Sequence, residues 1–120
     1  MHRPSLPLLL LATSLASIFA CTDPPIDVAS LTAPELFRHA RCDTCHGGNR
    51  AGTFLGPPIQ GIAANWERDA LVEYIRDPKP VIESTPRLAA MAEKFASPMV
   101  GSPQLDRRAR EKLADWVLKF

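Results

Sequence analysis

Cys42-Asp43-Thr44-Cys45-His46 is the stretch of the sequence that decides the fold. Two thiols stand three residues apart and an imidazole directly follows the second, which makes a C-x-x-C-H pattern. Closely spaced cysteines serve a thiol–disulfide redox pair, a zinc site, a structural disulfide or the covalent attachment of haem. The residues around the pattern discriminate between these uses.

The surroundings of the pattern favour haem. A thioredoxin-like redox pair needs a βαβ context, and no stretch of this chain alternates in hydropathy like a strand. Structural zinc needs four ligands, whereas only Cys42, Cys45 and His46 cluster, with His39 on the preceding predicted helix and expected at the surface. A plain disulfide would not need the histidine. Two cysteines at a helix end reach the two vinyl groups of a haem as thioethers, and His46 then faces the iron.

Residues 1–20 are typical of an export signal that is removed from the mature protein. Arg3 gives a positive start, residues 6–19 carry no charge, and the small residue Ala20 stands at the expected cleavage point. A membrane-spanning helix is disfavoured, because a span needs roughly 20 apolar residues and this shorter run contains Pro7. We therefore expect the protein to function outside the cytoplasm.

Cys21 directly follows this signal. An apolar Ile18, a small Ala20 and then Cys21 resemble the lipobox of bacterial lipoproteins, in which the cysteine is acylated and becomes the new amino terminus. An ordinary cleavage after Ala20 that leaves a free thiol is the alternative. The resemblance implies a periplasmic protein anchored to a membrane through Cys21.

Residues 21–31 are the expected lipidated cysteine and tether, and residues 32–120 the expected domain. Adjacent prolines at 24 and 25 favour an extended path. The chain has 14 Lys+Arg against 13 Asp+Glu, and removal of the signal takes away only Arg3. This balance lacks the positive excess that a nucleic-acid-binding protein needs. A length of 120 residues allows one compact domain.

Capping signals and apolar spacing predict about four short helices in this domain. The first begins at Thr32 and runs towards Cys42, with Glu35 placed as in a capping box. The others cover about 66–77, capped by Asn65 and ended by Pro78, a short stretch after Thr85, and about 106–119. Residues 47–64 and 97–105 are expected to be loops.

Several residues outside the motif make the mature chain resemble a class I c-type cytochrome over nearly all of residues 30–120. Phe37 stands five residues before Cys42, Gly56-Pro57 begins ten residues after His46, and Leu113 and Trp116 match the Leu-x-x-aromatic pattern of the last helix. The resemblance implies an all-α fold wrapped around one haem c, held covalently by Cys42 and Cys45. It also implies that His46 binds the iron, that the Pro57 carbonyl accepts a hydrogen bond from this imidazole, and that the last helix crosses the first.

The second axial ligand is expected to be Met99. Removal of the signal leaves Met91 and Met99 as the thioethers of the mature chain. Met99 follows Pro98 in a loop before the last helix, the type of loop that supplies the ligand in the family. Met91 shares a helical face with Leu88, Ala92 and Phe95, where a methionine usually fills the core. Met91, or no methionine at all, remains the alternative.

A haem iron with His46 and Met99 as axial ligands has no position open to substrate. The resemblance therefore implies a one-electron carrier rather than an enzyme, with a redox protein as donor and another as acceptor, working as a monomer or as a subunit of a respiratory complex. A haem subunit of a larger oxidoreductase is one alternative, and a ligand-binding or peroxidase-type haem protein that lacks the methionine ligand is another.

Three further sets of side chains have predicted roles. Trp66 and Tyr74 either line the haem, or hydrogen-bond one of its propionates, or pack in the core. The basic cluster Arg107, Arg108 and Arg110 is predicted to be a solvated helix face. The same cluster could instead dock an acidic partner.

Overall fold

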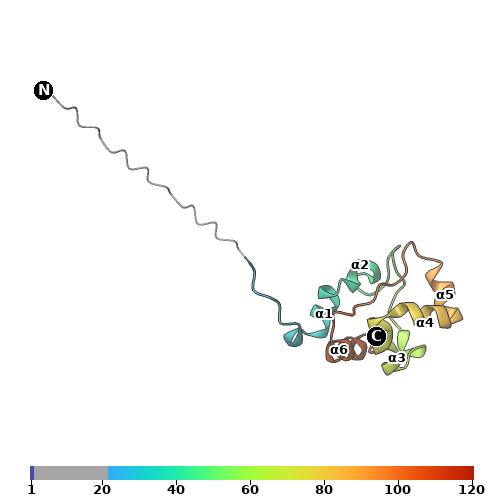
Figure 1. Ribbon diagram of the computed structural model, residues 1–120. Helices are drawn as coiled ribbons and strands as arrows, with labels where there is room; N and C mark the ends of the chain where they lie inside the picture. The colour runs from blue at the N-terminus through green and yellow to red at the C-terminus, as the bar shows by residue number, and fades with distance from the viewer. Residues whose placement is uncertain (2–21) are drawn as a thin grey trace.

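The computed structural model of the protein describes Met1 and residues 22–120. Most of the predicted export signal and the predicted lipidation site Cys21 lie outside the described residues. Residues 22–26 are exposed and lead into a short 3-10 helix, η1 (Val28–Ser30), as Figure 1 shows. In the described part of the chain, no helix has the length and apolar character needed to cross a membrane.

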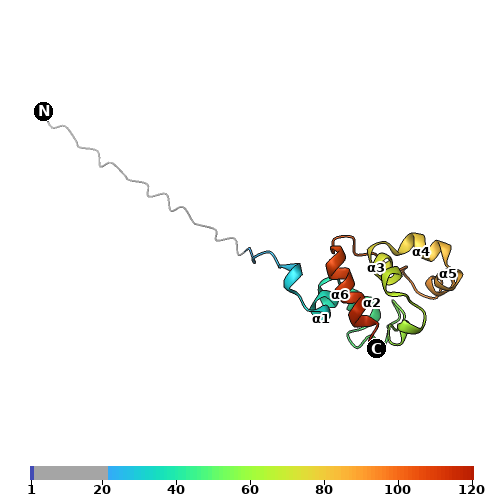
Figure 2. The same cartoon turned by 90° about the horizontal axis from the view of Figure 1, so that it is seen from below.

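The predicted all-α fold class is confirmed. Residues 22–120 contain six α-helices, and their only β pairing is an isolated bridge between Thr53 and Gly56. Figures 1 and 2 show the helices around a common centre, with α5 at the end of the domain opposite α1. In chain order the elements are α1 (Ala33–His39), α2 (Cys42–His46), η2 (Ile62–Ala64), α3 (Arg68–Arg76), α4 (Pro78–Ser84), α5 (Pro86–Ala92) and α6 (Arg107–Val117).

Helices α1 and α6 form the centre of the hydrophobic core. The Glu35 carboxylate accepts hydrogen bonds from the Thr32 backbone N–H (2.7 Å) and hydroxyl (2.6 Å), so the first helix starts where its capping signal predicts. Phe37 meets the edge of Trp116, with ring centroids 5.5 Å apart. The buried apolar side chains of α1, α3 and α6, together with Leu105 from the loop before α6, make up this core: Leu36, Phe37, Leu71, Val72, Ile75, Leu105, Ala109, Leu113, Ala114 and Val117.

The segment before α1 is fixed to α6 by a lysine. The Lys112 ammonium donates to the Leu31 carbonyl at 2.7 Å and to the Ala29 carbonyl at 3.3 Å. The Asp27 side chain caps η1 by accepting from the Ala29 N–H. The chain is therefore attached to the domain from Asp27 onwards, before the first α-helix begins.

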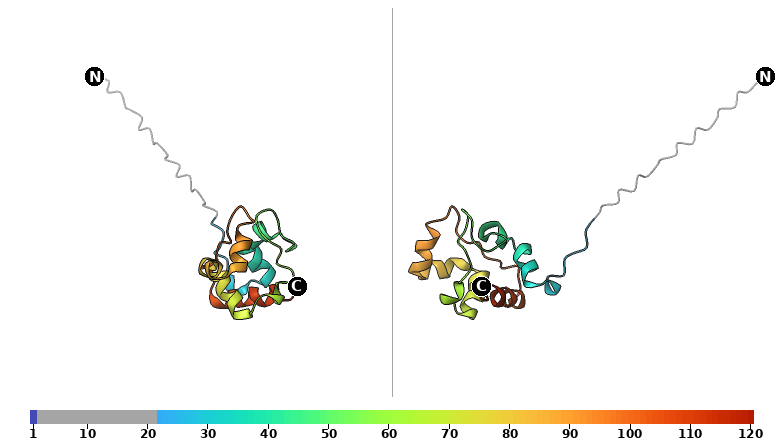
Figure 3. Two further views of the ribbon diagram at one scale, coloured as in Figure 1. Left: turned by 90° about the vertical axis from the view of Figure 1, so that its right-hand side faces the viewer. Right: turned by 180° about the vertical axis from the view of Figure 1, so that it is seen from behind.

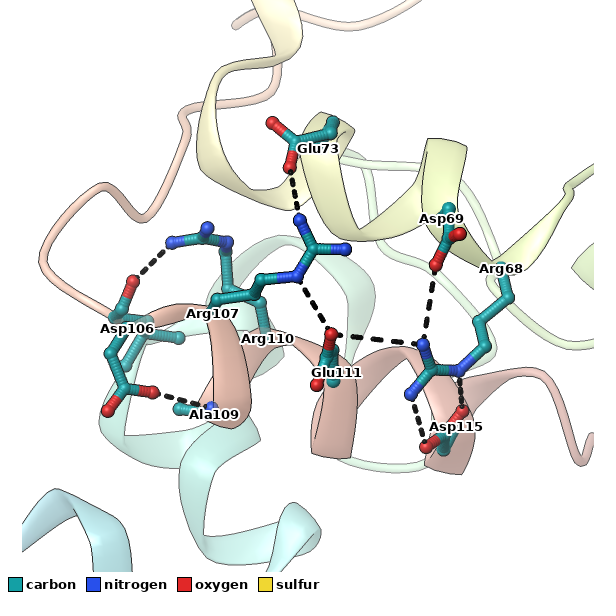
Figure 4. Close-up of polar contacts among 10 residues, drawn as sticks. Arg68, Asp69, Glu73, Asp106, Arg107, Ala109, Arg110, Glu111 and Asp115 are labelled. Carbon is teal, nitrogen blue, oxygen red and sulfur yellow. Dashed lines mark hydrogen bonds and ion pairs between the residues drawn. The ribbon is translucent and has the colours of Figure 1, made fainter.

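Helices α3 and α6 are joined at the surface by ion pairs, shown in Figure 4. The Arg68 guanidinium donates to both carboxylate oxygens of Asp115, at 2.6 and 2.9 Å. Arg107 donates to Glu111 at 2.9 Å within α6 and lies 3.8 Å from Glu73 of α3. The hydrogen bonds from Arg68 hold the pKa of Asp115 below its usual value.

The helices differ from the sequence prediction in several places. The motif residues Cys42–His46 form a separate helix, α2, and η2 lies within a segment that was predicted to be a loop. Helix α3 begins two residues later than predicted, with Glu67 rather than Asn65 as its N-cap. Pro78 does end α3, but it also starts α4, which was not predicted. Proline is tolerated in the first turn of a helix, because the N–H that it lacks would have no intrahelical partner there.

Arg110 is not part of a solvated face, so the prediction for it is wrong. Its side chain is buried and donates through Nη1 to the Leu105 carbonyl, at the end of the loop before α6 (Figure 4). Arg107 and Arg108 are exposed as predicted. Burial of Arg110 follows from its position on the face of α6 that carries Leu113 and Ala114.

Candidate functional site

A cavity of about 610 Å³ lies within the helical shell. Residues from all six α-helices line it, together with the loop before η2 and the loop between α5 and α6. These two loops lie side by side at one edge of the domain in both views of Figure 3. A cavity of this size, lined mainly by apolar groups, is typical of a site for a small molecule or cofactor.

Helix α2 carries the C-x-x-C-H motif along one wall of the cavity. Arg41 adopts a left-handed conformation (φ 60°) between α1 and α2, so the chain turns and a new helix starts at Cys42. Cys42, Cys45 and His46 all line the cavity. Both thiols are free and half-buried. The motif therefore places two thiols and an imidazole on the wall of the same cavity.

The environment of Cys42 does not suit a redox-active pair. Burial, aided by the nearby Asp43 carboxylate, raises the pKa of the Cys42 thiol to about 11. Reactive cysteines of C-x-x-C redox motifs have a lowered pKa, because their surroundings stabilise the thiolate. The described residues also contain no cluster of three or more His, Cys, Asp or Glu side chains arranged to hold a metal ion. Haem needs no such cluster, because its ring supplies four nitrogen ligands to the iron.

His46 is held as an iron-binding histidine requires. Its side chain is 9% exposed, and Nδ1 lies 2.8 Å from the Pro57 carbonyl oxygen. A carbonyl can only accept, so Nδ1 carries the proton and Nε2 keeps the lone pair that binds a metal. The contact between His46 and Pro57 that the resemblance implies is present.

Gly56 brings the loop of residues 47–58 directly against the motif. A Cβ on Gly56 would lie 3.0 Å from Cys45 Cβ and 3.1 Å from the Cys45 carbonyl oxygen. The same carbonyl accepts a hydrogen bond of 2.7 Å from the Thr53 hydroxyl, and the Thr53 N–H donates to Gly56 at 2.9 Å. The loop is thereby fixed so that the adjacent Pro57 reaches His46.

Met99 and Met91 both lie on the cavity wall, and both are half-buried. Met99 belongs to the loop between α5 and α6, which is attached to α3 where the Ser102 N–H donates to the Ile75 carbonyl at 2.8 Å. Met91 belongs to α5, and its predicted stripe partners Leu88, Ala92 and Phe95 line the cavity as well. The apolar face of α5 that carries Met91 therefore lines the cavity, which differs from the predicted role of Met91 as a core-filling side chain.

Trp66 and Tyr74 also line the cavity, and they contact each other, with ring centroids 4.6 Å apart. Burial raises the pKa of the Tyr74 hydroxyl, because it disfavours the charged phenolate. Arg87 was not singled out in the sequence; it lines the cavity beside Trp66, with Cζ 5.8 Å from the indole ring. His39 is exposed, as predicted, and is not among the lining residues.

A helical shell around an apolar cavity, with a C-x-x-C-H helix on its wall and a hydrogen-bonded histidine facing inwards, defines a protein that carries covalent haem. Residues 32–120 match the family model for cytochrome c, and the chain belongs to the cytochrome c family. Comparison with curated proteins and with solved structures gave no match.

Membership of the family implies a covalently bound haem c, and Cys42 and Cys45 fit its attachment motif. The family is one of haem-based electron transfer. The residues present fit the group: the cavity is large and mostly apolar, two thiols stand on one wall, and Nε2 of His46 is available to the iron.

Proposed function

We propose that the protein is a one-electron carrier whose haem iron is bound by His46 and Met99. When bound, haem supplies the Fe(III)/Fe(II) couple. The observation that carries the proposal is that His46 of α2 and Met99 of the α5–α6 loop line the same cavity from segments far apart in the chain. A thioether ligand favours the reduced iron and raises the potential, and the apolar wall limits access of water.

Two axial side chains leave no coordination position for a substrate, which supports a carrier rather than an enzyme. The partners are then a redox protein that donates the electron and another that accepts it. Two other functions follow from specific outcomes. Binding of CO by the reduced native protein would favour a ligand-binding or peroxidase-type haem protein, and co-purification at fixed stoichiometry would favour a subunit of a larger oxidoreductase.

Met99→Ala tests the ligand assignment, with Met91→Leu as the matched control. We expect Met99→Ala to abolish the weak Fe(III)–sulfur band at the red edge of the optical spectrum, to open the reduced iron to CO and to lower the potential. Met91→Leu keeps an apolar side chain of similar volume, so it should cost less than about 1.5 kcal/mol of stability and leave the band unchanged.

The opposite pattern, with the band lost in Met91→Leu and kept in Met99→Ala, would assign the ligand to Met91. Equal CO binding by the native protein and both variants would contradict the carrier itself, because the iron would then be open in the native state.

We further propose that the mature protein is periplasmic and anchored through lipidated Cys21 after removal of residues 1–20. Support comes from the order of charged, apolar and small residues before Cys21. It also comes from the exposed residues 22–26, which lead away from the domain at the end opposite α5 (Figure 1). More than one acyl chain on the terminal cysteine gives stable membrane binding, since each buried methylene contributes about 0.8 kcal/mol.

Cys21→Ser tests the anchor by cell fractionation with and without detergent. We expect the unaltered protein in the membrane fraction, released only by detergent, and the variant in the soluble periplasmic fraction. Thr22→Ser, a neighbouring change that keeps the cysteine, serves as the control and should stay with the membrane. Membrane association that survives Cys21→Ser would point to a protein partner instead of a lipid.

A further inference from the structure

The loop of residues 47–58 presents the Pro57 carbonyl to the His46 ring, with 2.8 Å between the carbonyl oxygen and Nδ1. The two ends of this loop are joined by a backbone hydrogen bond from the Ile59 N–H to the Arg50 carbonyl, at 3.0 Å. Arg50 thus stands at the base of the loop, on the side that leaves the motif helix. The position of Arg50 therefore affects the position of Pro57.

The backbone of Arg50 adopts a left-handed conformation, with φ at 64°. Such a conformation is unfavourable for a residue with a Cβ, whereas glycine adopts it at low cost. In the same loop, Gly47 and Gly52 have positive φ values of 78° and 84°. An arginine at a position that glycine would fill at lower cost indicates a role for the arginine side chain.

The side chain of Arg50 extends over the aromatic rings at the end of α6. Its Cζ lies 3.9 Å from the centre of the Phe120 ring and 4.9 Å from the centre of the Trp116 ring. The side chain is half-buried, and its Nε is buried with no hydrogen-bond partner among the described residues. The guanidinium is therefore held by the ring faces through cation–π contacts, which are stronger where the cation is removed from water.

Phe120 contacts the chain on both sides of the loop base. The Arg50 guanidinium covers its ring, and its carbonyl accepts a hydrogen bond of 2.6 Å from the Gly61 N–H. The Phe120 ring meets Trp116 edge-on, with centroids 5.3 Å apart, and Trp116 meets Phe37 of α1 at 5.5 Å. These aromatic side chains therefore fix the base of the loop to α1 and α6.

We infer that the cation–π contacts of Arg50 position the loop so that the Pro57 carbonyl keeps its hydrogen bond to His46. This inference rests on the proposed binding of the iron by His46. An imidazole that donates such a hydrogen bond is a more basic ligand, and a more basic ligand favours Fe(III) over Fe(II). Arg50 is thus a positioning residue, which acts on the iron through the loop and the histidine.

Phe120→Leu tests the inference in the purified haem-containing protein, because it removes the ring face and keeps the charge of Arg50. The measurement is the exchange rate of the His46 Nδ1 proton with solvent, read from its paramagnetically shifted NMR signal in the oxidised protein. We expect this exchange to become about twofold to thirtyfold faster, the change in population that corresponds to the loss of a cation–π contact. At a fixed ambient potential, the oxidised-to-reduced ratio should shift towards the reduced form, because His46 then donates less electron density to the iron.

Arg50→Gly and Arg50→Lys separate the role of the side chain from that of the backbone. Glycine suits the left-handed conformation and lacks the guanidinium, so Arg50→Gly should relieve the backbone and still speed the exchange. Arg50→Lys should keep an exchange rate close to that of the unaltered protein, since an ammonium also binds over an aromatic ring. Arg108→Gln is the control for the loss of a positive charge. Arg108 is exposed on α6, so its replacement should leave the exchange rate unchanged.

An unchanged exchange rate in Phe120→Leu or in Arg50→Gly, or an equal change in Arg108→Gln, would overturn the inference. A role in stability alone would lower the unfolding midpoint in guanidinium chloride and leave the exchange under native conditions unchanged. Failure of the proposed iron binding is a separate result, because a histidine that does not bind the iron shows no such shifted ring proton in the unaltered protein. Should Phe120→Leu not accumulate, the comparison of Arg50→Gly with Arg50→Lys decides through the same rate.

Discussion

At the scale of single residues, Gly56 sets the distance between the loop of residues 47–58 and the motif helix. Its hypothetical Cβ would lie closer to Cys45 than ordinary van der Waals contact allows. The neighbour is the backbone and Cβ of a residue that haem attachment also fixes, so it has little freedom to move away. A methyl group here would push Pro57 away from the His46 ring that it orients.

We predict that Gly56→Ala destabilises the haem-containing protein by about 1–3 kcal/mol, the usual cost of overpacking. The measurement is guanidinium unfolding, followed by the optical spectrum of the haem. Gly48→Ala is the matched control, because a Cβ on Gly48 would meet nothing within 4 Å. Equal unfolding midpoints for the two variants would contradict the packing argument.

At the scale of secondary-structure elements, the ion pair between Arg68 and Asp115 joins α3 to α6. Both side chains are substantially exposed, with 43% and 49% of their side-chain surface accessible, so their contribution to stability is small. The contribution of this ion pair to the stability of the fold depends on pH. A carboxyl whose pKa is lower in the folded than in the unfolded protein stabilises the fold above its unfolded pKa, and this stabilisation is lost as the pH falls through the folded pKa.

We therefore predict that Asp115→Asn lowers stability at pH 7 and has less effect at pH 3, which is below the ordinary aspartate pKa of about 3.9. Urea unfolding at the two pH values measures the difference between the variant and the unaltered protein. Asp23→Asn, in the exposed segment before η1, is the control and should have no effect at either pH. A loss of stability that is the same at pH 3 and pH 7 would show that the lowered pKa of Asp115 does not contribute.

Local signals account for much of the helical structure and for less of the site. Thr32 and Glu35 mark the start of α1, and the C-x-x-C-H pattern locates the haem-binding wall, because these signals depend on near neighbours in the chain. Helix α4 escaped prediction because the prolines at its start also occur in breaks between helices. Arg110 was predicted to be exposed but is buried, and Arg87 was not predicted to line the cavity. Both properties depend on how segments far apart in the chain pack against each other.

At the scale of the whole molecule, the shell of helices encloses a large cavity beside the hydrophobic core of α1, α3 and α6. Apolar side chains of α5, of the loop before η2 and of the loop between α5 and α6 face this cavity. A cavity left empty costs stability in proportion to its volume, and a small domain buries a limited fraction of its surface to begin with. The native fold is thus expected to depend on haem.

We predict that the Cys42→Ala/Cys45→Ala double variant carries no covalent haem and, purified without haem, shows no cooperative thermal transition. A haem stain of a denaturing gel tests attachment, and circular dichroism during heating tests folding. Covalent haem in the double variant would contradict the attachment by Cys42 and Cys45. A sharp, native-like transition in the haem-free protein would contradict the dependence of the fold on haem.

The hydrogen bonds of Lys112 limit the length of the tether between the domain and the proposed membrane anchor, and so limit how the domain could diffuse. Because Lys112 of α6 bonds to the Ala29 and Leu31 carbonyls, residues 22–26 are the stretch that separates the domain from the anchor proposed at Cys21. Five extended residues span at most about 18 Å, less than the roughly 30 Å thickness of a bilayer's hydrocarbon core. A tether this short would confine the domain to a thin layer next to the lipid headgroups. Electron delivery would then be a two-dimensional search along the membrane, limited by lateral diffusion of lipid and not by crossing the periplasm.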